Sequence, residues 1–424
     1  MFKAYFFDMD GVLYDSMPNH AAAWEKIMQR HGLHFTKRDC YLNEGRTGYD
    51  VIHEAMSYEQ NREVNDEEID AIYREKTESF SALGGAKPMR GILEVLTYLK
   101  TFSPQIWIVT GSGQQTLFDR LQTDFPSIFT RERMVTAFDV RYGKPNPEPY
   151  LIAWQRSGLQ KQECVVIENA PLGVKAGKAA GLFVIAVNTG VLTRQDLYDA
   201  GADIVLNDMA ELLLFMKIHR YVESEILPQY DSFDKGHRQE HARHVMQESL
   251  NIVRELSLKG EDYNPILAYL IAAYHDIGLR INREEHHLYS GKAIREDTVL
   301  RQWFDEEQIE QMAQAAEDHR ASRKEQPRSM YGCIVAEADR QIDPLTVVRR
   351  TVLYGLKHYP DISKDDHINR AICHLQEKYG ENGYLRCWLQ TERNRLGLQR
   401  LREMIAHERQ LRSTIKEILQ DVEE

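Results

Sequence analysis

The chain of 424 residues has few cysteines and lacks long apolar runs. Its five cysteines are far apart, and no two stand in the CxxC spacing, which suits reduced thiols better than a disulfide framework or a zinc knuckle. The longest apolar stretch, residues 266–274, is too short to cross a bilayer, and an aspartate at position 8 comes too early for the apolar core of a signal peptide. We therefore expect reduced thiols and a cytoplasmic protein.

An excess of positive charge is also missing, because the formal net charge is −12 at pH 7. Such a chain repels polyanions, so binding to nucleic acid polymers or to a membrane is disfavoured. A pocket for a small phosphorylated metabolite is still compatible with this charge. No linker rich in proline, glycine or serine divides the chain, but 424 residues exceed what one core usually organises, and two or three domains are expected.

The first half of the sequence alternates short apolar runs with helical stretches, which predicts a parallel sheet with crossover helices. The predicted strands occupy residues 3–8, 105–111, 134–139, 164–169, 183–189 and 202–208. Asp8, Thr110 and Glu168 stand near the ends of three of these strands. Because ligands of open α/β sheets bind at the carboxyl ends of the strands, these side chains are predicted to converge on one site.

A helical insertion at residues 17–87 separates the first two strands and is too long for a crossover, which predicts a small helical cap. Strand signals end after residue 208, and the rest of the chain reads as helix almost throughout. We therefore predict an α/β domain at residues 1–217 and an all-α domain at residues 218–424.

The stretch AYFFDMDGVLYDS, residues 4–16, places two carboxylates, Asp8 and Asp10, where a buried strand ends. Gly11 permits the tight turn that brings the backbone close to a ligand. Two carboxylates this close repel each other unless a proton or a cation lies between them, so the stretch predicts a divalent metal site.

This stretch resembles the DxDGxxxDS opening of the haloacid dehalogenase superfamily, in its phosphatase and β-phosphoglucomutase-like branch. The segments IVTGS, YGKPNPEPYL and VVIENAPLGVKAG follow in the order of the family's motifs, and the resemblance covers residues 1–215. It implies a Rossmann-like α/β fold with a helical cap, an aspartyl-phosphate intermediate and a requirement for Mg²⁺.

Carried over by position, the resemblance implies that Asp8 is the nucleophile and Asp10 the general acid and base. The implied ligands of the phosphoryl group are Thr110, Gly111 and Lys144. The implied ligands of Mg²⁺ are Asp8, the backbone carbonyl of Asp10, and Glu168 or Asn169. Many relatives carry a second acidic residue where this chain has Asn169, so Glu168 is the preferred ligand.

Two residues of the predicted cap complete the implied site. His20 would face the leaving group, and the guanidinium of Arg46 would hold a second anion of the substrate. A histidine at a helix terminus and a solvated arginine are the structural alternatives.

The second half carries histidines and aspartates near the ends of helical stretches. His275 and Asp276 close an apolar stretch just before Gly278, and an ionised carboxylate buried there is costly unless it is paired or bound to a metal. Histidines satisfied within the core are the alternative for any one of them. The series resembles the HD superfamily of metal-dependent phosphohydrolases, whose ligands lie on a helical bundle. The implied ligands are His241, His275, Asp276 and Asp339, with His287 and His319 holding a second metal bridged by Asp276.

Imidazole and carboxylate ligands suit Mn, Fe, Zn, Ni or Co, and a bound water with a lowered pKa would attack phosphorus directly. A basic loop with Arg320, Lys324 and Arg328 follows His319 and holds the substrate phosphate in one reading, or is solvated in another. The last helical stretch, residues 384–424, completes the bundle or makes an oligomer contact.

The sequence thus predicts a bifunctional phosphohydrolase that acts on small phosphate monoesters, such as sugar phosphates or nucleotides. One alternative is that the first domain is a sugar-phosphate mutase, because an aspartyl-phosphate serves both reactions. For the second domain, the alternatives are a regulatory ligand-binding module and an iron centre that performs oxygen chemistry. A homo-oligomer is compatible with all of these readings.

Overall fold

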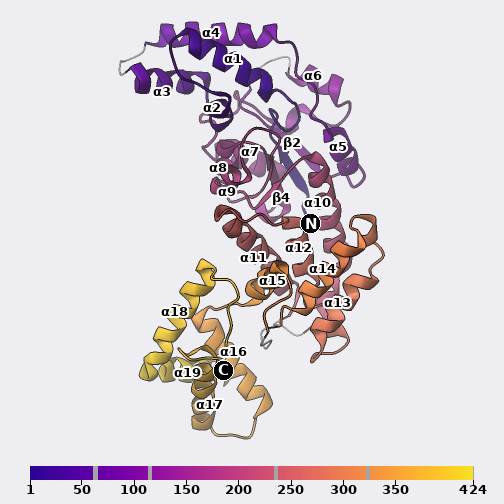
Figure 1. Cartoon of the computed structure of the whole chain (residues 1–424), viewed down its shortest axis with the longest axis vertical. Coiled ribbons are helices and arrows are strands. Elements are labelled where there is room, and N and C mark those ends of the chain that lie inside the picture. Colours follow the sequence, from indigo (N-terminus) through magenta and orange to yellow (C-terminus); the bar gives the residue numbers. More distant parts are fainter. Residues whose placement is uncertain (61–64, 113–116, 234–236, 321–324, 424) are drawn as a thin grey trace. The chain divides into compact units, whose positions relative to one another are not determined.

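The structure is a computed structural model that describes residues 1–60, 65–112, 117–233, 237–320 and 325–423. The chain divides into two compact units, shown in the cartoon of Figure 1. The first, here called unit 1, contains Met1–Tyr221 and Leu256–Tyr263. The second, unit 2, contains Val222–Glu255 and Asn264–Glu424. The chain therefore leaves unit 1 after α10 (Met209–Tyr221) and returns to it briefly.

Unit 1 is built on a parallel sheet whose strands follow the order β3-β2-β1-β4-β5-β6. Their bounds are Ala4–Phe7 (β1), Gln105–Val109 (β2), Met134–Val135 (β3), Cys164–Glu168 (β4), Phe183–Val187 (β5) and Ile204–Leu206 (β6). The two central strands, β1 and β4, are buried over their whole length, which agrees with the continuous apolar runs of their sequences. The parallel α/β sheet that the sequence predicts is therefore confirmed.

The third strand is shorter than predicted. It ends at Val135, because the next residue begins a turn in which the backbone N–H and the hydroxyl of Thr136 both donate to the carboxylate of Asp139, each at 2.9 Å. This local pairing gives the backbone an alternative to the sheet ladder.

Helices of unit 1 connect and follow its strands, and some of them pack apolar side chains against the sheet. They are α5 (Ile92–Lys100), α6 (Leu117–Asp124), α7 (Glu148–Ser157), α8 (Pro171–Ala179), α9 (Arg194–Asp199) and α10, with short helices η1 (Arg131–Arg133) and η2 (Lys161–Glu163). Gly177 of α8 allows close packing, since a Cβ there would lie 2.8 Å from a methyl group of Val184.

The insertion between β1 and β2 is helical. It contains α1 (Met17–Arg30), α2 (Lys37–Leu42), α3 (Gly48–Gln60) and α4 (Asp66–Ala82), which Figure 1 shows gathered together. These helices share a small apolar core of their own, with Trp24, Ile27, Met28 and Ile52 among its members. We refer to residues 17–87 as the cap.

Unit 2 is helical, and none of its described residues forms a strand. Its longer helices are α11 (Gln239–Leu258, whose last turn enters unit 1), α12 (Pro265–Tyr274), α13 (His286–Glu296), α14 (Glu306–Glu317), α15 (Met330–Asp339), α16 (Pro344–His358), α17 (Lys364–Tyr379), α18 (Glu392–Ala406) and α19 (Glu408–Glu423). The short helices are η3 (Val222–Ile226), η4 (Leu227–Ser232), η5 (Ile277–Arg280) and η6 (Leu300–Gln302). The prediction of a helical C-terminal half is confirmed.

Helix α12 occupies the interior of unit 2, since each of its ten residues is buried. Helices α16 to α19 share a separate apolar core that includes Val348, Leu375 and Leu401. No helix among the described residues is long and apolar enough to cross a membrane. The five cysteines all lie in described segments and are free thiols.

We predict that the sheet core limits the stability of unit 1. Ile108 in β2 is fully buried, so Ile108→Ala is expected to lower the free energy of unfolding by about 2–5 kcal/mol through lost burial and a residual cavity. Leu93 in α5 is 49% exposed, and Leu93→Ala is the matched control, with an expected change below about 0.5 kcal/mol. Hydrogen exchange of unit 1 peptides in increasing urea measures the difference, and equal effects of the two substitutions would contradict it.

Candidate functional site

The ends of three neighbouring strands form the first candidate site. Because β1 lies between β2 and β4, Asp8, Thr110 and Glu168 come together at one edge of the sheet. All three side chains are buried. The tight turn after Asp8 includes Gly11 at φ +73°, where a Cβ would lie only 2.1 Å from Nδ2 of Asn169, so glycine is required by both backbone conformation and space.

Lys144 contacts the carboxylates of two of these strands. Its ammonium donates hydrogen bonds to Oδ1 of Asp8 and, at 2.6 Å, to Oε1 of Glu168. The remaining lone pairs of Glu168 are also engaged, because Oε1 accepts from the hydroxyl of Tyr150 at 2.7 Å and Oε2 accepts from the N–H groups of Asn169 and Ala170. Glu168 is therefore a fully satisfied buried carboxylate.

Burial and the neighbouring charged groups shift the pKa of Asp8. Burial raises the pKa of Asp8 to about 7, with Lys144 opposing the shift and Glu168 reinforcing it. For Lys144, burial disfavours the ammonium, but the carboxylates of Asp8 and Glu168 raise its pKa well above the ordinary value. Asp8 and Lys144 therefore form an ion pair in which burial and Glu168 disfavour the ionised form of Asp8.

Asp10 faces the cap. It accepts a hydrogen bond from Ser16, and Nε2 of His20 lies 3.7 Å from its Oδ1. Nδ1 of the same imidazole lies 2.9 Å from Nζ of Lys76. Burial alone would raise the pKa of Asp10, but the contacts with His20 and Ser16 lower it below its usual value. The predicted His20 thus lies beside Asp10. Lys76 of α4 was not predicted, because no local sequence pattern distinguishes it from the exposed lysines of a helix.

A cavity of about 270 Å³ lies between the sheet edge and the cap, within unit 1. Its lining combines the acidic pair with aromatic cap residues such as Trp24 and Phe80, and it includes the predicted Gly111. Thr110 accepts a hydrogen bond from the N–H of Ser112 at 3.1 Å. Arg46 also lines the cavity, but its guanidinium contacts Glu54 and, at 3.2 Å, Asn43.

One buried oxygen of the site lacks a partner that a divalent cation could provide. Asn169 is only 4% exposed, and its Oδ1 is buried with no hydrogen-bond partner among the described residues. An orphaned buried acceptor of this kind costs about 1–3 kcal/mol, which a cation would remove. Oxygen ligands from Asp8, Asp10 and Asn169 suit Mg²⁺, so the residues fit that ion.

Comparison with known proteins places this half of the chain. A sequence model of the haloacid dehalogenase-like hydrolases matches residues 2–181. Hexitol phosphatase A from Escherichia coli strain K12 is 35% identical over 189 residues, which cover 44% of this chain and 83% of that protein. The chain belongs to the haloacid dehalogenase-like hydrolases. As predicted, it is a hydrolase that acts on phosphate esters.

Other relatives of this hydrolase have similar coverage. A phosphorylated carbohydrates phosphatase from Thermotoga maritima is 29% identical over 226 residues, which cover 50% of this chain and 100% of that protein. Among solved structures, a "Putative beta-phosphoglucomutase from Bacteroides vulgatus" is 50% identical, with a TM-score of 0.49, and the match covers 51% of this chain and 88% of that chain. The family match at residues 2–181 leaves unit 2 of the hydrolase outside it.

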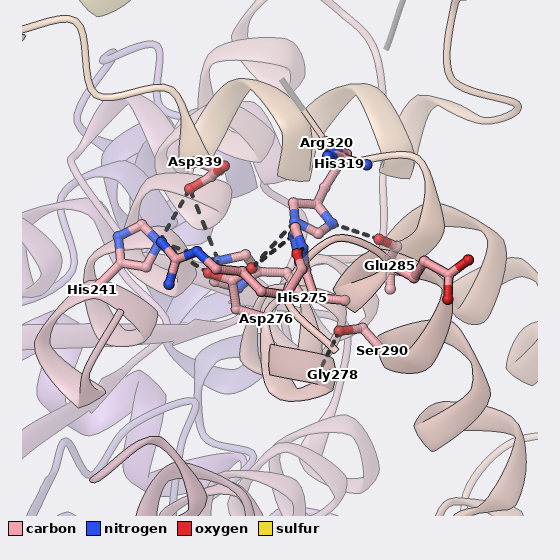
Figure 2. Close-up of polar contacts among 12 residues, drawn as sticks. His241, His275, Asp276, Gly278, Glu285, Ser290, His319, Arg320 and Asp339 are labelled. Carbon is pink, nitrogen blue, oxygen red and sulfur yellow. Dashed lines mark hydrogen bonds and ion pairs between the residues drawn. The ribbon is translucent and has the colours of Figure 1, made fainter. Parts of the chain in front are cut away.

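Unit 2 contains the second candidate site, a cluster of imidazoles and carboxylates. Two sets of three residues each bring one ligand atom per residue within 4.8 Å of one another. One set is His241, His275 and Asp276, and the other is Asp276, His286 and His319. Figure 2 shows Asp276 between His241 and Asp339 on one side and His319 on the other. Asp276 therefore belongs to both sets.

The distances divide the two oxygens of Asp276 between these sets. Its Oδ2 lies 3.4 Å from Nε2 of His275 and 3.7 Å from that of His241, while its Oδ1 lies 3.4 Å from Nε2 of both His286 and His319. Asp339 completes the first side, with Oδ1 3.1 Å from Nε2 of His241. A carboxylate with one oxygen toward each set is the arrangement that bridges two cations.

Hydrogen bonds to the backbone orient three of the imidazoles. Nδ1 of His275 lies 2.7 Å from the carbonyl oxygen of Ala272, and Nδ1 of His319 lies 2.6 Å from that of Ala316. His286 makes the same contact with the carbonyl of Arg283 at 2.8 Å. A carbonyl can only accept, so Nδ1 carries the proton and the lone pair of Nε2 points into the cluster.

The cluster favours positive charge. Nε2 of His241 and Nε2 of His275 face each other at 3.3 Å, and a proton or a cation must lie between two such nitrogens. Burial lowers the pKa of His275, but Asp276 more than compensates and raises it to about 9. The residues present fit one or two transition-metal ions.

One predicted ligand is not in the cluster. The sequence favoured His287 for the second metal, whereas the residue of α13 that lies beside Asp276 is its neighbour His286. Adjacent helical residues point about 100° apart, so only one of the two can face the cluster, and the doublet in EEHHLYSG does not show which. Burial and the neighbouring His286 lower the pKa of His287 to about 4.

The basic loop after His319 is only partly described. Arg328 donates to the buried carboxylate of Asp318 and to Glu317, so its guanidinium is engaged. Arg320 donates to the backbone carbonyl of Glu284 at 2.8 Å. Lys324 lies outside the described residues.

We predict that His286, and not His287, is a metal ligand. His286→Ala is expected to remove up to one equivalent of bound transition metal from the purified full chain, because it deletes one of three ligands of the second set. His287→Ala is the matched control and should retain the wild-type metal content. Elemental analysis by mass spectrometry measures both, and a greater loss in the His287 variant would reverse the assignment.

Proposed function

We propose that unit 1 is a phosphatase for small sugar or sugar-alcohol phosphates. The observation that carries this proposal is the buried Asp8 carboxylate, which is held against Lys144 at the strand ends, next to the cavity beneath the cap. Hexitol phosphatase A and the phosphorylated carbohydrates phosphatase, both similar to this chain, support the sugar substrate class by their names.

The proposed reaction runs through Asp8. A carboxylate oxygen of Asp8 attacks phosphorus, the ester P–O bond breaks, and the leaving oxygen takes a proton from Asp10. Water then attacks the phosphoryl group on Asp8 and gives its proton to Asp10, which releases phosphate and restores Asp8. Asp10 must be protonated for the first step, and the negative charge of the incoming phosphoryl group raises its pKa toward that state.

Other residues hold the reacting groups. Lys144, Thr110 and the backbone amide of Gly111 bind phosphoryl oxygens, and Lys144 also offsets the charge that gathers around Asp8. His20, oriented by Lys76, faces Asp10 from the cap and exchanges a proton with it or with the leaving group.

Mg²⁺, when bound, would supply charge neutralisation around the transferred group. Asp8, the backbone carbonyl of Asp10 and Oδ1 of Asn169 would hold it, and Oδ1 of Asn169 has no other partner among the described residues. We place Glu168 behind them as a partner of Lys144, because its own oxygens are already engaged by Lys144, Tyr150 and two backbone amides.

The test is phosphate release from a panel of hexose and hexitol phosphates with Mg²⁺. Asp8→Asn is expected to lower kcat/KM by about 10³-fold or more, because it deletes the nucleophile. Asp70→Asn, at an exposed position of α4, is the matched control and should be unaffected. Retained activity in the Asp8 variant would contradict the mechanism. Conversion of a sugar 1-phosphate to its 6-phosphate without phosphate release would instead identify a mutase.

We further propose that unit 2 is a metal-dependent phosphohydrolase of the HD type. Its support is the shared position of Asp276 between two sets of histidines on different helices. His241, His275, Asp276 and Asp339 would hold one cation, and Asp276, His286 and His319 the other. When bound, the cations would supply an activated water and a Lewis acid for hydrolysis of a phosphoester.

For unit 2, the expected result is that Asp276→Asn abolishes both metal binding and turnover of a distinct set of phosphoesters, with nucleotides and Mn²⁺ in the panel. The sugar phosphatase activity of unit 1 should persist in this variant. Asp361→Asn, at an exposed position of the same unit, is the matched control. Metal loss without loss of any turnover would favour a regulatory module, and an oxygen-dependent product from an iron-loaded protein would favour oxygen chemistry.

A further inference from the structure

Only the nitrogen end of the Asn169 side-chain amide has a hydrogen-bond partner among the described residues. Its Nδ2 donates to both carboxylate oxygens of Glu44, at 3.2 and 3.0 Å. The other end of the amide, Oδ1, is the buried acceptor that has no partner among the described residues. A carboxylate can only accept hydrogen bonds, so Glu44 fixes the amide with its nitrogen toward the cap and its oxygen free.

Glu44 reaches this position from the cap, two residues after α2. The next residue, Gly45, adopts φ +92°, and a Cβ there would lie 3.3 Å from the side chain of Lys144. Its carbonyl oxygen lies 3.6 Å from the place where a Cβ of Gly143 would stand. These close approaches show that the cap loop rests directly on the catalytic edge of the sheet, with glycines on both sides of the contact.

The charge around Glu44 requires compensation. Glu44 lines the same cavity as the carboxylates of Asp8, Asp10 and Glu168. The ammonium of Lys144 contacts two of these four carboxylates, those of Asp8 and Glu168, and the ammonium of Lys76 also lines the cavity. A divalent cation would offset the negative charge of the carboxylates that Lys144 does not contact.

We propose that Glu44 is a positioning residue of the cation site in unit 1, and that it supplies from the cap the negative charge that Asn169 lacks. Glu44 orients the Asn169 amide so that Oδ1 faces the cation. It also places a negative charge beside Asn169, which is itself a neutral ligand. Cation binding and the docked position of the cap loop therefore support each other. The inference rests on the proposed Mg²⁺-dependent phosphatase.

The experiment measures Mn²⁺ binding directly, by the loss of the free-ion signal in electron paramagnetic resonance. All proteins are the full chain with Asp276→Asn, so that the cluster of unit 2 does not contribute. Glu44→Gln is expected to weaken Mn²⁺ binding about tenfold or more. The exchange variant, Glu44→Gln with Asn169→Asp, moves the charge onto the ligand itself and should recover affinity to within about threefold of the parent. Glu67→Gln, at an exposed cap position, is the charge-matched control and should bind like the parent.

Each outcome separates this inference from the proposed function. If Glu44→Gln binds Mn²⁺ like the parent, the role of Glu44 is overturned while the phosphatase proposal stands. If the exchange variant folds but does not recover affinity, the charge argument is overturned. If the parent binds no Mn²⁺ that Asp8→Asn removes, the cation site itself is wrong, and the proposed function falls with it.

Discussion

The buried ion pair between Lys144 and the carboxylates of Asp8 and Glu168 is the interaction on which unit 1 depends. The parallel register sets Phe7 beside Ile167, so the residues that follow place two buried carboxylates side by side. Without the ammonium, both could not be ionised at neutral pH. Tyr150 of α7 donates to Glu168, so the helix that follows the lysine loop is tied to the same carboxylate. Two strands, the loop that carries Lys144 and helix α7 are therefore joined by the contacts of Nζ of Lys144 and of the Glu168 carboxylate.

The two candidate sites solve the same electrostatic problem with different chemistry. In unit 1 the ammonium of Lys144 neutralises the carboxylates of Asp8 and Glu168 at the strand ends, and the amide of Asn169 is neutral. In unit 2 imidazoles surround Asp276, and backbone carbonyls orient those of His275 and His319. The first arrangement suits a hard, strongly hydrated ion held by oxygen atoms, and the second suits softer transition metals. The two donor sets therefore differ in the class of cation that they favour.

Much of unit 1 could be predicted from the sequence, because a buried parallel strand is a continuous apolar run and each catalytic strand ends in a polar residue. The position of Lys144 followed from its motif in the same way. Glu44 and Lys76 could not be predicted, since they reach the site across the cap interface and stand in no local pattern. In unit 2 the apolar stretch before His275 correctly indicated a buried helix, but the choice between His286 and His287 depended on helix phase, which two adjacent histidines leave open.

The contacts of His275 and His319 with backbone carbonyls have a consequence for the whole cluster. Each imidazole binds the carbonyl three residues earlier, in the final turn of α12 or α14, where carbonyl groups lack partners within the helix. Both helices therefore terminate at the cluster and direct the negative ends of their macrodipoles toward it. The carbonyl groups of these last turns thus favour positive charge at this point, so the backbone as well as the side chains sets the charge that the cluster accommodates.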